Sequence, residues 1–305
     1  MTTRRASMLA AFAIVGLVVT ACGGAASPEP TATPTAPPTA TPAPPPTPGP
    51  TAEPSGEASD DHGGEMRTVE APEATITVDG DPSDWQGIDG LELTLEAIQG
   101  EEVEAKNASL KVAHDEDFLY VLFEVEDDYD WLADDPHLSG SAAVMWGIDS
   151  GAGEHMGAEE PDRDTSLGMV DLWHWELECA AGAENGGAVS GPGEGSDPGD
   201  DGACNLDDEW ATVPDEREDD NGNYAENSIL GVWSHTNPTA GGAGTWIFEL
   251  SRPLQTGDEQ DAQFTVGEKA LMALAYWDPD QSPDGWVDDG HLQSANQGWI
   301  EVHVE

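Results

Sequence analysis

A tract rich in proline, threonine and alanine at residues 27–56 limits how much of this 305-residue chain can fold. The tract has too few large apolar side chains to bury a core, and its prolines favour an extended polyproline conformation. At about 3 Å per residue it spans up to about 90 Å. The acidic stretch that follows continues the same spacer. We therefore assign residues 22–71 to a disordered linker and expect one folded domain at residues 72–305.

The first 21 residues have the features of a bacterial signal peptide. Arg4 and Arg5 precede an apolar run at residues 8–19 that is too short to span a bilayer. The run leads into the sequence VTAC at residues 19–22, which resembles the lipobox in which the cysteine is lipidated and becomes the new N-terminus. We therefore predict an extracytoplasmic protein, at the cell surface or in the periplasm, with a membrane anchor on Cys22.

The chain has 62 Asp and Glu against 9 Lys and Arg, which gives a formal net charge of −53. So few basic side chains cannot form the basic face that binds phosphate backbones, which excludes nucleic acid and acidic membrane surfaces as partners. A compact body this negative repels itself unless salt screens the charge. The composition fits either a saline habitat or a bias of the lineage.

Three cysteines are present. If Cys22 carries lipid, Cys179 and Cys204 remain as a pair outside the cytoplasm, where we expect a disulfide. The segment between them is rich in glycine and acidic residues, so a covalent link would limit the entropy of a stretch with little packing of its own. The alternative is a metal or redox pair, which neither CxxC spacing nor a following histidine supports.

The folded part has the pattern of an all-β protein without long amphipathic helices. Residues 74–78 alternate before a turn, and residues 108–113 and 118–125 flank a turn as in a hairpin. Further strands are expected at residues 142–148, 169–176, 244–250, 270–277 and 299–304. Many short strands separated by Gly, Pro and Asp turns predict an antiparallel β-sandwich, with the 11 tryptophans supplying much of the core.

Five segments, in order, resemble the haem-binding domain of ethylbenzene dehydrogenase. They are residues 78–85 (VDGDPSDW), 108–127, 170–175 (VDLWHW), 244–254 (GTWIFELSRPL) and 273–278 (ALAYWD). In that family the domain is the gamma subunit of dimethyl sulfoxide reductase-type molybdenum enzymes, and its fold resembles family 9 carbohydrate-binding modules. The resemblance covers nearly all of residues 74–304 and implies a β-sandwich that holds haem b without covalent links.

The resemblance implies two axial iron ligands, a methionine and, in the dehydrogenase, a lysine. The methionine precedes a glycine upstream of the Trp-rich strand, and Met156 before Gly157 occupies this position here. A thioether is a soft ligand that favours reduced iron and can raise its potential. The alternatives are that Met156 is an ordinary loop residue or that the adjacent His155 is the ligand.

The second ligand departs from the family pattern, because residues 279–298 contain no lysine. They contain His291, whose imidazole nitrogen is a good iron ligand in place of the amine. The alternative is an exposed turn histidine among aspartates. If His291 is not a ligand, the iron is five-coordinate or the site has been lost.

Residues around the Trp-rich strand are also candidates for the haem pocket. His174 lies between Trp173 and Trp175, and strand alternation places the two indoles on one face and the imidazole on the other. His174 then faces the haem edge or a propionate, or it is a partly buried polar residue on the outer face of the sheet. Trp146, Trp173 and Trp175 are either core residues or pocket-lining residues.

Acidic clusters allow a second kind of metal site. Residues 219–223 (DDNGN) resemble a calcium loop but lack its twelve-residue spacing and terminal glutamate. Five aspartates crowd a later loop: Asp278, Asp280, Asp284, Asp288 and Asp289. Two explanations of these acidic clusters stay open: a solvated acidic surface or a site for a structural Ca²⁺ ion. No Ser-His-Asp motif, glycine-rich phosphate loop or HExxH motif occurs.

These features predict a non-catalytic haem b protein that transfers electrons outside the cytoplasm. The linker would let it reach a redox partner protein, for which a molybdenum oxidoreductase is one candidate. The alternative is a binding module without haem that holds a glycan or another apolar-faced ligand on exposed tryptophans such as Trp286. A third possibility is a surface protein that kept the fold and lost both sites.

Overall fold

The computed structural model describes residues 66–98, 103–130, 140–159, 163–176, 205–219, 228–278, 280–281 and 291–305. All of these residues belong to the compact unit formed by residues 58–305. None of the helices they form is long and apolar enough to cross a membrane. The signal peptide, Cys22, Cys179, Cys204 and Trp286 lie outside the described residues, so the domain limits, the lipidation and the disulfide stay predictions.

Thirteen strands and three short 3-10 helices form in the described part of the chain, which confirms the all-β prediction. The strands are β1 (Arg67–Ala71), β2 (Leu91–Ala97), β3 (Lys106–His114), β4 (Phe118–Asp128), β5 (Ser141–Gly147), β6 (Val170–Glu176), β7 (Asn205–Ala211), β8 (Arg217–Asp219), β9 (Leu230–His235), β10 (Ala243–Pro253), β11 (Lys269–Trp277), β12 (His291–Gln293) and β13 (Ile300–Val304). The 3-10 helices are Pro82–Trp85, Pro214–Glu216 and Ala295–Gln297.

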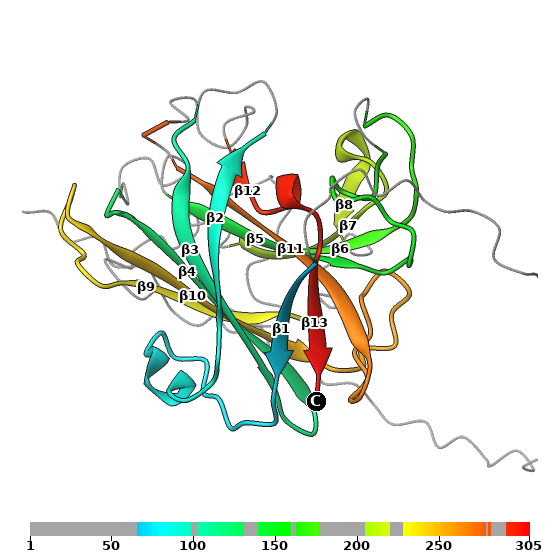
Figure 1. Ribbon diagram of the computed structural model, residues 1–305, viewed down its shortest axis with the longest axis horizontal. Coiled ribbons are helices and arrows are strands. Elements are labelled where there is room, and N and C mark those ends of the chain that lie inside the picture. The colour runs from blue at the N-terminus through cyan, green and yellow to red at the C-terminus, as the bar shows by residue number, and fades with distance from the viewer. Residues whose placement is uncertain are drawn as a thin grey trace, which may run out of the picture. The chain divides into compact units, whose positions relative to one another are not determined.

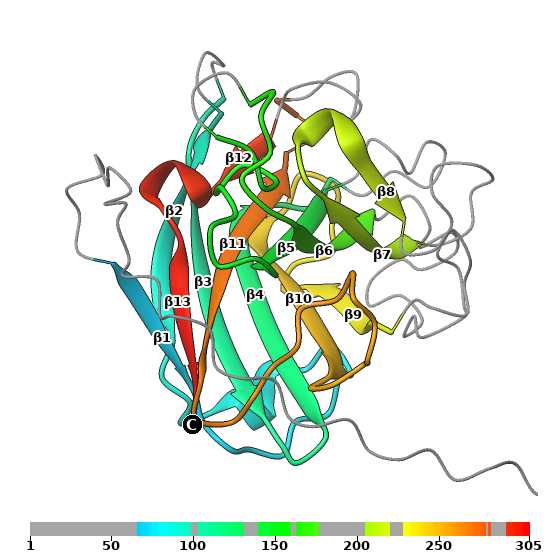
Figure 2. The ribbon, with the colours of Figure 1, turned by 90° about the vertical axis from the view of Figure 1, so that its right-hand side faces the viewer.

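The strands form two layers. One layer has the order β2-β3-β4-β10-β9, and the other runs β8-β7-β6-β5-β11, with β12 and β13 also paired to β11. Figure 1 shows β3, β4, β10 and β9 side by side, and Figure 2 shows β5, β6 and β7 of the second layer. Neighbouring strands within both layers are antiparallel, whereas β1 pairs parallel with β13. The predicted antiparallel sandwich is therefore confirmed.

Strand alternation places one face of each layer in a shared core. Trp146 of β5 and Trp173 of β6 are fully buried there, with ring centroids 5.4 Å apart. They belong to the same apolar cluster as Phe123 of β4 and Phe248 of β10 in the opposite layer. The opposite faces of β5 and β6 are therefore left for other contacts.

One buried carboxylate holds the segment that opens the domain. Glu249 of β10 accepts hydrogen bonds from Trp85 Nε1 at 2.7 Å and from the backbone N–H groups of Asp79 and Gly80 at 3.0 and 2.6 Å. Gly80 has a φ of +79°, a conformation that side chains disfavour. Residues 78–85 are therefore attached to the sandwich through their backbone and one indole.

One buried arginine joins the two layers. Arg252 of β10 donates hydrogen bonds to Asp171 of β6 at 3.0 Å and to Asp208 of β7 at 3.1 Å. Its Nη1 also lies 3.1 Å from Asp261, and its guanidinium lies 5.0 Å from the ring centroid of Trp173. Burial raises the pKa of Asp171 to about 6, although the charge of Arg252 acts to lower it. One positive charge thus supports three buried carboxyl groups.

Replacing Arg252 with methionine removes the charge and keeps much of the apolar volume. We expect the free energy of unfolding to fall by about 3–5 kcal/mol, because the three carboxyl groups lose their counterion. Urea unfolding measures this change. The control is Lys269→Met, because Lys269 forms an exposed ion pair with Glu301 at 2.6 Å and should contribute less than about 1 kcal/mol. Equal losses in the two variants would contradict the central role of Arg252.

Candidate functional site

A cavity of about 350 Å³ lies on the face of the β5–β6–β11 layer opposite the core. On β5, Val144 points into the core, so its neighbours Ala143 and Met145 face the cavity. On β11, Ala273, Ala275 and Trp277 face the cavity by the same alternation, and Leu274 of the core also contributes to its lining. The alternation that builds the core therefore also builds an apolar floor for this pocket.

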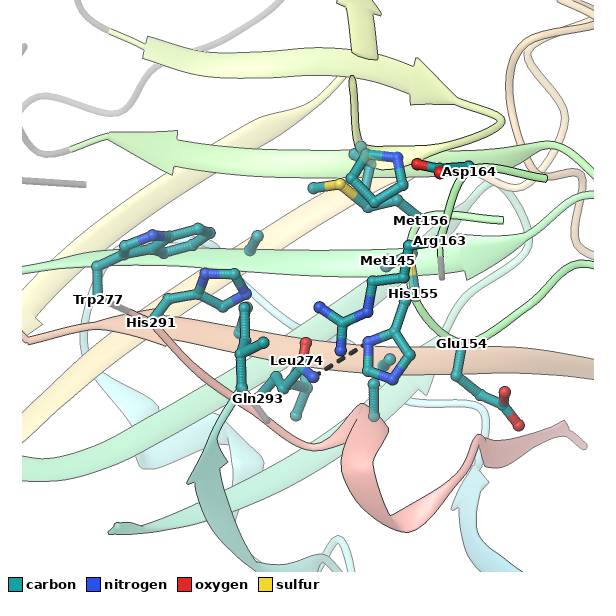
Figure 3. Close-up of a pocket in the computed structure, with 17 residues that line it drawn as sticks. Met145, Glu154, His155, Met156, Arg163, Asp164, Leu274, Trp277, His291 and Gln293 are labelled. Carbon is teal, nitrogen blue, oxygen red and sulfur yellow. Dashed lines mark hydrogen bonds between the residues drawn. The ribbon is translucent and has the colours of Figure 1, made fainter. Parts of the chain in front are cut away.

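The loop between β5 and β6 forms one wall of the pocket and carries His155 and Met156 (Figure 3). Its backbone closes on itself, since Gly157 N–H donates to the Gly153 carbonyl at 3.0 Å and Leu167 N–H donates to the Gly157 carbonyl at 2.8 Å. Gly157 has a φ of +86°, and a Cβ atom there would lie 2.2 Å from the Gly168 carbonyl oxygen. Glycine is therefore required at this position for the wall to form.

Two residues of the pocket have a strained backbone. Met156 and Arg163, with φ values of 51° and 55°, are the non-glycine residues with positive φ in the described part of the chain, and both line the cavity. Left-handed conformations cost a side-chain-bearing residue about 1–2 kcal/mol, and they persist where the surrounding structure imposes them. The loop thus places both side chains at the pocket, and Met156 also packs against the apolar cluster that contains Met145 and Leu172.

Gln293 of β12 orients two imidazoles. Its Nε2 lies 3.1 Å from His155 Nδ1, the contact drawn as a dashed line in Figure 3, and it also donates to Asn296 Oδ1 at 2.5 Å. Because an amide nitrogen only donates, His155 Nδ1 accepts, which assigns the proton of the neutral imidazole to Nε2. Gln293 also forms a hydrogen bond with His291.

Trp277 forms the end of the pocket beside His291. The two ring centroids lie 4.8 Å apart, and the imidazole of His174 lies 5.1 Å from the Trp277 ring. His174 is buried on β6, where its Nδ1 is 3.5 Å from Glu209 Oε2. Trp277 therefore contacts two imidazoles, one from β6 and one from β12.

The electrostatic surroundings keep His291 neutral. Burial lowers the pKa of His291 to about 4, and electrostatic interactions with His174, Arg163 and His155 act in the same direction, whereas the hydrogen bond with Gln293 opposes them. Near pH 7 the ring therefore has one nitrogen that donates and one that accepts.

The structure places some of the predicted site residues together and separates others. Met156, His291 and His155 line one pocket. Of the two roles that the sequence left open for Trp146, Trp173 and Trp175, the described structure shows the core role: all three belong to the core between the layers and do not line the cavity. His174 faces away from that core, as alternation predicted, but it packs against Trp277 and does not line the cavity.

The prediction did not assign Arg163, Gln293 and Trp277 to the site. The position of Trp277 could have been predicted from the sequence, because alternation along β11 places it on the face opposite the core residues Met272, Leu274 and Tyr276. Arg163 and Gln293 belong to no recognisable motif. Their places in the pocket follow from the fold of the loop and from the pairing of β12 with β11.

No family model and no curated protein matches the chain, whereas solved structures do resemble it. A carbohydrate-binding module of family 9 from Caldicellulosiruptor kristjanssonii in complex with glucose shares 12% identity, with a TM-score of 0.38, over 78% of this chain and 97% of that one. A family 9 module from the same species in complex with cellotriose shares 13% identity, with a TM-score of 0.37, over 78% and 95%. A putative carbohydrate-binding protein from Bacteroides uniformis shares 10% identity, with a TM-score of 0.46, over 79% and 100%. Likenesses this distant assign no ligand to this chain.

The prediction of a haem-binding electron-transfer domain related to ethylbenzene dehydrogenase is wrong. No such family matches the chain, and the three solved structures named above are described as carbohydrate-binding proteins. The physical reason is that the five segments behind the resemblance are parts of the sandwich: the segment held by Glu249, the β3–β4 hairpin, and strands β6, β10 and β11. They specify a fold, and a fold by itself does not specify a ligand.

The calcium hypothesis concerns the loop after β11, of which residues 278, 280 and 281 are described. Carboxylate oxygens of Asp127, Asp130 and Asp278 lie within 4.8 Å of one another. Lys106 Nζ lies 2.7 Å from Asp278 and also contacts Asp127, so a lysine already supplies positive charge to this cluster. Asp284, Asp288, Asp289 and residues 220–223 lie outside the described residues, and the Ca²⁺ ion stays a prediction.

The acidic cluster predicts a pH dependence of stability. Burial raises the pKa of Asp130 to about 8, and the negative charges of Asp127 and Asp278 add to the rise. An aspartate in the unfolded chain titrates near pH 4, so between about pH 4 and pH 8 the folded protein holds a proton that the unfolded chain has lost. The stability contributed by this proton therefore falls as the pH rises through that window.

We expect Asp130→Asn to lose less thermal stability than the wild type when the pH is raised from 5 to 8, because its amide does not titrate. Thermal unfolding followed by circular dichroism at several pH values measures the difference. Asp280→Asn, which removes an exposed carboxylate of the loop after β11, is the control and should keep the wild-type slope. An unchanged slope in Asp130→Asn would contradict the buried, protonated state of Asp130.

Proposed function

We propose that this protein is a non-catalytic binding module that holds carbohydrate in the pocket beside Trp277. The observation that carries the proposal is the combination of an indole, an apolar floor and several fixed hydrogen-bonding side chains in one cavity. A sugar ring presents C–H groups that pack on an aromatic face and hydroxyl groups that need donors and acceptors at its edge. Such mixed lining is typical of small-molecule sites.

The size of the cavity supports a small ligand. Its volume of about 350 Å³ lies at the lower end of the range of about 300–1,000 Å³ that is usual for ligand pockets. A cavity of this size encloses a short saccharide or the terminal residues of a chain.

The polar groups of the pocket are held in place before any ligand arrives. Gln293 is buried, and its partner Asn296 donates a hydrogen bond to the Ala97 carbonyl at 2.7 Å, which ties the amide network to β2. His155 and His291 are both oriented by Gln293. Side chains that are already ordered lose little conformational entropy on binding, which favours affinity.

The carboxylates at the pocket support a binding role and not glycoside hydrolysis. A glycosidase needs two carboxyl groups that flank the scissile bond across a short gap. Figure 3 shows the Glu154 carboxylate directed away from His155 and Asp164 on the far side of Met156. Neither carboxylate lies at the Trp277 end, where we place the sugar ring. Trp286, the tryptophan first considered for glycan binding, lies outside the described residues.

Replacing Trp277 with alanine should weaken saccharide binding by about tenfold or more, because the ligand loses its aromatic contact. Screening the full-length protein on a glycan array identifies ligands, and titration calorimetry measures the change. Trp210→Ala is the matched control, since Trp210 is a half-buried tryptophan of β7 that does not line the cavity. A blank array for the wild type, or equal affinities in the two variants, would contradict the proposal.

The loop wall gives a second test. Gly157→Ala should abolish binding while the sandwich remains folded, because the added methyl group collides with the Gly168 carbonyl and displaces Met156 and His155. Gly257→Ala is the matched control: Gly257 has a φ of +82° and nothing within 4 Å of an added Cβ. It should cost about 1–2 kcal/mol of stability from backbone strain alone and leave binding unchanged. Retained binding in Gly157→Ala would contradict the role of the wall.

A further inference from the structure

The hydrogen bonds of Gln293 fix the chemical role of the histidine beside Trp277. An amide nitrogen carries two hydrogens. Gln293 Nε2 directs one towards His155 Nδ1 at 3.1 Å and the other towards Asn296 Oδ1 at 2.5 Å. In its hydrogen bond with His291, Gln293 therefore contributes its carbonyl oxygen, and a ring nitrogen of His291 is the donor.

The orientation of the Gln293 amide is imposed by the backbone of β2. Asn296 Nδ2 donates to the Ala97 carbonyl at 2.7 Å, so Asn296 presents its Oδ1 to Gln293. Turning the Gln293 amide over would bring two oxygens together at this contact. Gln293 is also buried on β12, which pairs with both β2 and β11. A fixed chain of donors and acceptors thus runs from β2 to His291.

The second ring nitrogen of His291 is left as an acceptor at the pocket. The surroundings keep the ring neutral near pH 7, and a neutral imidazole has one N–H, which Gln293 receives. The other nitrogen then carries a lone pair and no hydrogen. His291 lines the cavity between Trp277 and Gln293, as Figure 3 shows. A ligand that displaces water from this nitrogen has to supply a donor, because an acceptor without a partner is costly once it is buried.

The charges of the pocket favour a neutral donor. The charged residues of the described lining are Arg163, Glu154 and Asp164, so the cavity has no excess of positive charge that would select an anion. A sugar hydroxyl is neutral and carries the hydrogen that the imidazole lacks. The imidazole and the Trp277 indole have ring centroids 4.8 Å apart, so a ring packed on the indole has its edge beside the acceptor.

We propose that His291 selects the ligand by accepting a hydrogen bond from one hydroxyl of a neutral saccharide whose ring packs on Trp277. This inference rests on the proposed carbohydrate-binding function. The class of ligand is a neutral sugar that keeps this hydroxyl free. Methylation or acylation of the same oxygen removes the hydrogen, and a site built around a hydrogen bond to a hydroxyl rejects analogues that cannot form it.

The experiment removes the donor from the sugar one position at a time. Methyl glycosides of glucose, galactose, mannose and xylose are titrated into the full-length protein by calorimetry. In the matched analogues, one hydroxyl is replaced by fluorine or by a methoxy group, neither of which can donate. We expect one ring position at which both replacements weaken binding by about tenfold or more, because each leaves the imidazole nitrogen without a partner.

The role of His291 is tested by His291→Phe, which keeps a ring against Trp277 and removes the acceptor. The parent sugar should bind about tenfold more weakly, and its advantage over the fluorinated analogue should fall below about twofold. His291→Gln supplies an amide oxygen as acceptor and should restore part of this advantage. His303→Phe is the matched control, because His303 pairs with Glu70 and Glu301 outside the cavity, and it should leave the advantage intact.

Nitrogen-15 NMR of the wild-type protein observes the acceptor directly and does not depend on the folding of a variant. We expect the His291 ring to show one protonated and one unprotonated nitrogen near pH 7. The resonance of the unprotonated nitrogen should shift when the parent sugar binds and stay in place with the analogue that lacks the hydroxyl. A ring with the tautomer of either nitrogen populated equally would contradict the fixed acceptor.

The outcomes separate this inference from the proposed function. If sugars bind and no ring position distinguishes the parent from its fluorinated and methoxy analogues, the selection by His291 is overturned while the carbohydrate-binding function stands. If the advantage of the parent survives in His291→Phe, the assignment to His291 is overturned. If no glycoside binds and the glycan array is blank, the proposed function fails and the inference fails with it.

Discussion

The contact between Arg252 and three buried carboxyl groups is the interaction on which the rest of the sandwich depends. Asp171 of β6 and Asp208 of β7 are fully buried acids whose burial is tolerable only because a guanidinium from the opposite layer reaches them. β6 is thereby held against β10. Since Leu172 on the other face of β6 lines the pocket, the same ion cluster that joins the layers also supports the floor of the site.

The floor and the wall of the pocket differ in the backbone conformations that they need. The floor is regular strand, which any sandwich of this kind provides, whereas the wall needs close backbone contacts at Gly157 and left-handed conformations at Met156 and Arg163. Strained loops persist where their surroundings impose them.

The error about haem has a structural origin in strand alternation. The recognised segments are rich in residues that build the core, such as Trp173 and Trp175, and these point away from the cavity. The residues that decide what binds lie between them on the same strands or in loops. The prediction did choose His155, Met156 and His291, which share the pocket, but it omitted Arg163, Gln293 and Trp277, which set its chemistry. Similarity carried by core positions therefore predicts an architecture better than it predicts a ligand.

The sequence by itself determined the all-β class, the antiparallel hairpins and the faces of β5, β6 and β11, because alternation and turn residues are local signals. It also determined that the protein is strongly negative, from which we predict that it does not bind nucleic acid. Only the tertiary structure decided that Arg252 takes its partners from two strands of the other layer, and that β12 brings Gln293 and His291 to the loop of residues 148–169. These contacts join residues that lie from 44 to 138 positions apart in the chain, and no local pattern encodes which distant side chains meet.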